Sequence, residues 1–75
     1  MEIAIGSTVT WHELPLDRRF TMRIVRPQHM KPDRIGKDLP ANSPIAKAII
    51  GLATGDVVEV DTPVGTKTVT IMEVT

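Results

Sequence analysis

The chain has no cysteine and no long apolar run. Without cysteine it can form neither a disulfide, nor a thiolate nucleophile, nor a zinc site with cysteine ligands. No segment approaches the roughly 20 apolar residues of a membrane-spanning helix. The apolar run near the start, IAI, is too short for the hydrophobic region of a signal peptide. We therefore expect a cytoplasmic protein with no membrane partner.

A surplus of either charge is also absent, because nine lysines and arginines balance nine aspartates and glutamates. Binding to a phosphate backbone depends on surplus basic side chains that displace counterions. The composition therefore favours a protein partner and predicts no direct nucleic-acid binding. A chain of 75 residues suffices for one small domain, which we expect to extend over residues 1–75 with its core in 5–75.

Residues that could carry catalysis are few. His12 and His29 lie far apart, and neither has a pair of carboxylates at metal-ligand spacing. Asp56 and Asp61 stand in segments with glycine, threonine and proline that are typical of turns. We therefore expect no catalytic residue, no metal, no cofactor and no enzymatic activity.

Most of the chain has the apolar period of two that is typical of half-buried strands. In STVTWHEL, Val9 and Trp11 share one face; in RRFTMRIV, Phe20, Met22 and Ile24 do. The intervening LPLD favours a turn, which predicts an antiparallel hairpin. Trp11 is interpreted as a core residue or as part of a patch at the sheet edge.

A second hairpin is predicted from DVVEV and TKTVTIMEV, joined by the turn TPVG. The step from Ile71 to Val74 breaks the alternation and predicts a β-bulge near residues 72 and 73. Between the two hairpins, residues 26–41 contain three prolines and no sustained period. They predict a long surface connection with a short extended piece at 38–40.

The segment NSPIAKAIIG predicts a two-turn helix laid on the sheet. Ser43 suits the N-cap, Pro44 the first helical position, and Gly51 the left-handed conformation that ends a helix. So short a helix is stable only if it buries an apolar stripe. The predicted stripe consists of Ile45, Ala48 and Ile49.

Residues 42–74 also resemble the C-terminal domain of the GreA/GreB transcript-cleavage factor family, which includes the regulator of nucleoside diphosphate kinase. In that family a Ser-Pro opens a short helix, followed by Gly-Asp, an apolar strand, a Pro-Gly hairpin and a last apolar strand. IGSTVTW is similar to the family's first strand. The resemblance implies an α+β, FKBP-like fold in which a small antiparallel sheet packs against one short helix.

Three features depart from the family pattern. Residues 28–41 carry Lys31, Arg34 and Lys37 where an acidic stretch is usual. Ala46 and Val64 stand where the family commonly has glycine.

The resemblance implies docking on RNA polymerase near its secondary channel, where Asn42, Ser43 and Pro44 would contact the coiled coil of the largest subunit. The family's cleavage-stimulating acidic pair lies on an N-terminal coiled coil, for which the chain offers no segment. We therefore expect docking without cleavage-stimulating residues. The residues themselves leave a plainer alternative open: capping alone explains Ser43 and Pro44, and Asn42 could be a solvated loop residue.

Two other functions remain open. Exposed sheet edges invite self-association, including a homodimer. An FKBP-like fold also suggests prolyl isomerase activity, although only two aromatic residues are available to line a proline pocket.

Overall fold

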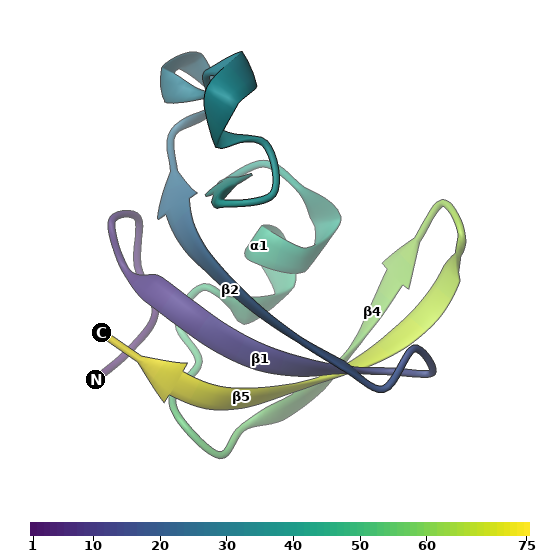
Figure 1. The fold of residues 1–75 in the computed structure, drawn as a ribbon. Helices are drawn as coiled ribbons and strands as arrows, with labels where there is room; N and C mark the ends of the chain where they lie inside the picture. The colour runs from purple at the N-terminus through teal and green to yellow at the C-terminus, as the bar shows by residue number, and fades with distance from the viewer.

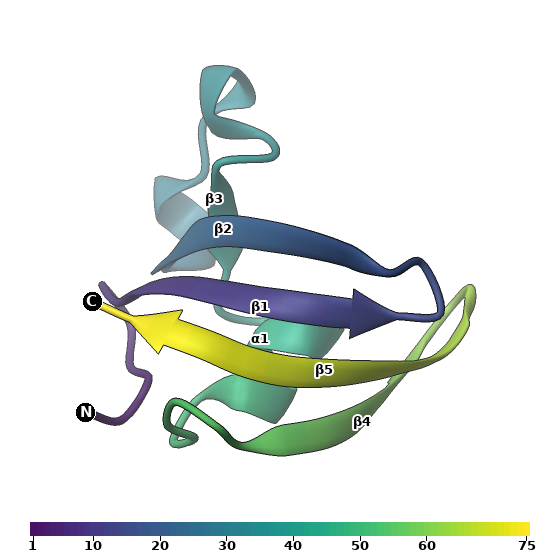
Figure 2. The same cartoon turned by 60° about the horizontal axis from the view of Figure 1, so that its bottom comes forward.

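The computed structural model describes residues 1–75, in which one curled sheet wraps around a short helix (Figure 1). The strand order is β3-β2-β1-β5-β4, so β1 and β5 lie in the middle. The elements are β1 Thr8–Leu14, β2 Arg18–Val25, β3 Asp38–Pro40, α1 Pro44–Ile49, β4 Val57–Thr62 and β5 Gly65–Val74. The α+β architecture is therefore confirmed. Figure 2 shows β2, β1, β5 and β4 side by side with α1 behind them.

The first predicted hairpin is confirmed, with β1 and β2 antiparallel and Trp11 opposite Phe20. The two rings stack with centroids 5.6 Å apart. Trp11 is 1% exposed and belongs to the hydrophobic core, which settles its two interpretations. The core also includes Ile3, which lies before the predicted 5–75 core.

The second hairpin and its bulge are also confirmed. β4 pairs antiparallel with β5 through Thr62 opposite Gly65. Along β1, Thr10 faces Glu73 whereas Trp11 faces Ile71, so Met72 is the extra residue. A bulge restores alternation for residues that would otherwise turn to solvent, and Val74 does pack against the core.

The connection after β2 contains two single 3-10 turns, η1 Pro27–His29 and η2 Pro32–Arg34, neither with a buried residue. The predicted extended piece is strand β3, which pairs in parallel with β2. The sheet is therefore mixed, and the antiparallel prediction applies to the pairings among its other strands. A parallel partner needs a crossover of about a dozen residues, which this connection supplies.

Helix α1 has the predicted caps. The Ser43 Oγ accepts a hydrogen bond from the Ala46 N–H at 3.2 Å, and Gly51 has φ +93°. The buried residues are Ala46 and Ile49, both 0% exposed, while Ile45 and Ala48 are half-buried. The predicted stripe does face the core, because Ile45 and Ala48 pack against it beside Ile49, and Ala46 is a further buried residue that the prediction did not include. No helix has the length and hydropathy needed to cross a membrane.

Candidate functional site

Residues 42–44 form an exposed corner where β3 leads into α1. The Ser43 N–H donates to the Pro40 carbonyl at 3.0 Å, which turns the chain from the strand into the helix. Asn42 and Pro44 are exposed, whereas Ser43 is half-buried because its hydroxyl caps α1. The structure therefore presents all three predicted partner-binding residues together, with Asn42 and Pro44 facing solvent.

The corner lies against the tip of the β4–β5 hairpin. A surface hollow of about 220 Å³ separates the two, with Leu39 and Ile45 on the corner side and Pro63 and Val64 on the hairpin side. Val64 is 83% exposed. The hairpin tip is fixed by the Thr62 hydroxyl, which donates to the Gly65 carbonyl at 2.7 Å. Two chain segments far apart in sequence thus frame one apolar depression.

A second hollow of similar size lies next to the first and shares Leu39, Ile45 and Lys67 with it. Its other apolar residues are Trp11, Leu16, Phe20 and Met22. Together the corner and the two hollows form what we call the corner surface. The Nε1 of Trp11, a lining residue of the second hollow, is buried and has no hydrogen-bond partner within the protein.

An ion pair joins the two hollows. The Lys67 Nζ donates to the Glu13 Oε2 at 2.9 Å, and the side chains are 18% and 3% exposed. Sequence reasoning missed this pair, because 54 positions separate its members. One signal was available: Glu13 continues the alternating face of Val9 and Trp11, so burial of a carboxylate could have been foreseen.

A third, larger hollow of about 520 Å³ lies at the end of β2, where the two 3-10 turns project from the sheet (Figure 1). We call it the basic hollow. Its charged and titratable lining residues are Arg23, His29, Lys31, Asp33, Arg34 and Asp38. It shares no lining residue with the corner surface.

Within the basic hollow, Arg34 holds Asp38 with two hydrogen bonds, from Nε at 3.2 Å and from Nη2 at 3.0 Å. These bonds lower the pKa of the Asp38 carboxyl; partial burial opposes the shift, and the charges of Arg34 and Arg23 add to it. The same bonds and the charge of Asp38 raise the pKa of Arg34. Both groups are therefore ionised near neutral pH.

The remaining polar candidates have local roles. Asp56 accepts a hydrogen bond from the Ala53 N–H at 2.9 Å, and Asp61 accepts one from the Thr66 hydroxyl, also at 2.9 Å. The turn interpretation is confirmed for Asp56, whereas Asp61 lies in strand β4 and its bond crosses to β5 just before the hairpin turn. The His12 Nε2 lies 2.6 Å from the Asp17 Oδ1. His29 lies elsewhere, in the lining of the basic hollow. No three histidines or carboxylates gather where they could share a metal ion.

Sequence comparison relates the chain to transcription elongation factors. It is 35% identical over 74 residues to GreA of Thermotoga neapolitana, covering 99% of this chain and 46% of that protein. It is 39% identical over 72 residues to GreA of Rickettsia canadensis, and the match covers 96% of this chain and 43% of that protein. The chain thus spans about half the length of these relatives.

Solved structures give the same relationship. GreA factor homolog 1 of Thermus thermophilus superposes with a TM-score of 0.78 at 25% identity, covering all of this chain and 49% of that one. The elongation factor GreA/GreB of Nitrosomonas europaea superposes with a TM-score of 0.73 at 29% identity, and the match covers 99% of this chain and 60% of that one. The FKBP-like fold of the GreA C-terminal domain is therefore confirmed.

The family model described as "Transcription elongation factor, GreA/GreB, C-term" matches residues 1–75. The match covers every strand and the capped helix that carries the Asn42–Pro44 corner. The chain therefore belongs to the GreA/GreB family of transcription elongation factors and corresponds to its C-terminal domain.

Proposed function

We propose that the chain is an RNA polymerase-binding module that docks near the secondary channel through the corner surface. The observation that carries this proposal is the exposed pair Asn42 and Pro44, held on a capped helix beside two apolar hollows. Family membership supplies the partner. The contact on the polymerase is the coiled coil of its largest subunit.

The geometry suits such a contact. Ser43 uses its hydroxyl inside the corner, so Asn42 is the polar side chain left free to bond a partner. The hollows offer apolar surface to side chains of a helical partner, with Leu16 53% and Val64 83% exposed. Interfaces derive most of their affinity from a few residues that become fully desolvated in pockets at the centre, surrounded by a polar rim.

The proposed role is docking and not catalysis. Family factors stimulate the polymerase's own cleavage of the transcript, and the acidic pair responsible belongs to an N-terminal coiled coil outside the domain matched here. The residues of this chain bind the factor to RNA polymerase. Its location is the cytoplasm, where bacterial RNA polymerase works.

Binding to core RNA polymerase tests the proposal. The Ser43→Ala/Pro44→Ala double variant should lower affinity at least about tenfold, the loss of one strong interfacial contact. Its unfolding free energy should fall by about 1 kcal/mol, the usual value of an N-cap. A full-length GreA should displace the wild-type chain. An affinity within about twofold of the wild type in the folded double variant, or no displacement by GreA, would count against the corner.

Self-association is a second candidate, because β4 is an edge strand and its Val57 is 61% exposed. An unpaired edge with apolar side chains favours strand pairing between copies. Sedimentation over a range of concentrations tests self-association. A mass that rises toward that of the dimer supports a homodimer, and a constant monomer mass excludes one.

A prolyl isomerase role has one observation in its favour. Both aromatic residues of the chain, Trp11 and Phe20, line the same hollow. A proline-peptide isomerisation assay would show a rate above background if that hollow binds proline productively. A background rate would leave the corner surface as a docking site alone.

A further inference from the structure

We propose that the basic hollow binds a phosphate group, supplied by a nucleotide or by the backbone of a nucleic acid. The hollow lies at the end of β2 and is bounded by η1, η2 and β3. It is separate from the corner surface, and the proposal does not depend on docking to RNA polymerase.

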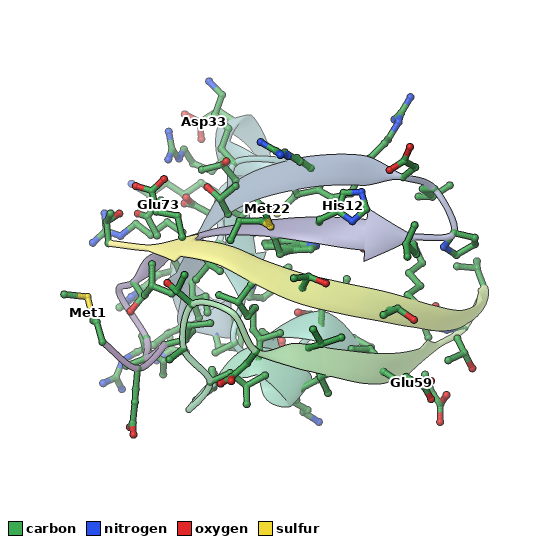
Figure 3. All side chains as sticks on the ribbon, turned by 90° about the horizontal axis from the view of Figure 1, so that it is seen from below. Met1, His12, Met22, Asp33, Glu59 and Glu73 are labelled. Atoms are coloured by element: carbon green, nitrogen blue, oxygen red, sulfur yellow. The ribbon has the colours of Figure 1, made fainter.

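Charge is distributed unevenly along the chain. Seven of the nine lysines and arginines lie between Arg18 and Lys37, together with a single acidic residue, Asp33. The rest of the chain has only two basic residues but eight acidic ones. The sheet order places β2 and β4 on opposite sides, and Figure 3 shows Asp33, from the basic segment, and Glu59, on β4, at opposite edges. The basic residues therefore gather on the β2 side of the sheet, where Asp17 and Asp38 also lie, and the β4 side is acidic. A net charge of zero conceals one basic edge.

The basic hollow contains a cation that is fixed in place. Arg34 is held by two hydrogen bonds to Asp38, whose side chain is only 10% exposed. The Arg34 side chain is 42% exposed, so the Nη1 donors that do not bond Asp38 remain available to a ligand. A guanidinium already held in place loses less side-chain entropy when it binds phosphate.

Cations outnumber carboxylates within the basic hollow. Arg23 stands opposite Asp38 in the parallel register, so two arginines flank one carboxylate. Lys31, between the two turns, adds a third cation to the lining, and the exposed Asp33 adds a second carboxylate. Three cations therefore face two carboxylates. Phosphate, which offers several acceptor oxygens and a negative charge, complements that surplus.

The size and polarity of the hollow fit the same ligand. Its volume of about 520 Å³ lies within the range of small-molecule sites. Only Val25 and Met30 among its lining residues are apolar, so it is unsuited to an apolar ligand. His29 and Gln28 add ring and amide nitrogens to the lining.

The test is a nuclear magnetic resonance titration of the 75-residue chain with three probes: inorganic phosphate, adenosine monophosphate and a short single-stranded RNA. We expect amide shifts within residues 23–38, and an affinity that falls at least about tenfold in Arg23→Gln/Lys31→Gln, since each lost bond is charge-assisted. Both residues are exposed, so the variant should retain its fold.

The matched control is Arg18→Gln/Arg19→Gln, which removes the same charge from the other end of β2. It should weaken binding no more than about twofold, by general electrostatics. Equal affinity for the mononucleotide and the RNA identifies a single-phosphate site, and tighter, strongly salt-dependent RNA binding identifies the backbone. Equal weakening by both variants, or no shifts in 23–38 with any probe, would overturn the proposal.

Discussion

The corner surface and the basic hollow differ in what holds them in place. Beneath the corner, Ala46 and Ile49 are fully buried, and the Glu13–Lys67 pair ties β1 to β5. Around the basic hollow, the two 3-10 turns bury no residue, and the Arg34–Asp38 pair is the ion pair that secures them. The first surface is part of the folding core, and the second is attached to it.

This difference separates binding from stability. A change beneath the corner should weaken the fold and the surface together, because both depend on the same buried side chains. A change in the basic hollow should alter a ligand site at little cost to the fold.

Lys67→Met should have the largest effect. It leaves the Glu13 carboxylate buried without its cation, which typically costs about 3–5 kcal/mol. Chemical denaturation measures the loss. The exposed Lys47→Met is the control and should change stability by less than about 0.5 kcal/mol. The double variant Glu13→Gln/Lys67→Met should recover much of the loss, and a double variant no better than Lys67→Met would contradict the pairing argument.

Ile49→Ala should come next, at about 2–5 kcal/mol, because the residue is fully buried and its removal leaves a cavity under α1. The neighbouring Ile50→Ala removes the same atoms from a side chain that is 39% exposed and should cost clearly less. Thermal unfolding compares the two. Similar costs would mean that α1 does not anchor the corner.

Ser43→Ala should cost about 1 kcal/mol through the lost N-cap, whereas Ser43→Asp should remain within a few tenths of the wild type because aspartate caps as well. Denaturation separates the two variants. If Ser43→Asp retains stability yet loses polymerase binding, the corner itself is the contact. Equal destabilisation by both variants would show that the cap is not what holds the helix start.

The smallest effect is expected in the basic hollow, from Asp38→Asn. The pKa of Asp38 is lower in the folded chain than its ordinary value, so its stabilisation is complete above that value and is lost as the pH falls through the folded-state pKa. The variant should therefore lose less stability than the wild type on acidification. Parallel curves for Asp38→Asn and the wild type would refute the argument.

The fold was largely predictable because its signals are local. The Ser-Pro cap, the TPVG turn and the broken alternation before Val74 each appear within a few residues, and the structure confirms the cap, the hairpin and the bulge. The parallel pairing of β3 with β2 was not predicted, because a three-residue strand gives no sign of its partner or direction.

The site was predictable only in part. Asn42, Ser43 and Pro44 were identified through a family resemblance, and the structure adds their exposure and their apolar neighbours. The hollows and the Glu13–Lys67 pair come from segments far apart in sequence, so no local pattern reveals them. The basic edge was hidden because a net charge of zero carries no information about position.

The most direct test of the central claim is site-specific photo-crosslinking to RNA polymerase from position 42, with the exposed position 54 as the control. The account predicts that a photoreactive residue replacing Asn42 crosslinks to the coiled coil of the largest subunit and that full-length GreA abolishes the product. Absence of a crosslink from position 42 in a folded chain, or equal labelling from position 54, would contradict docking through the corner surface.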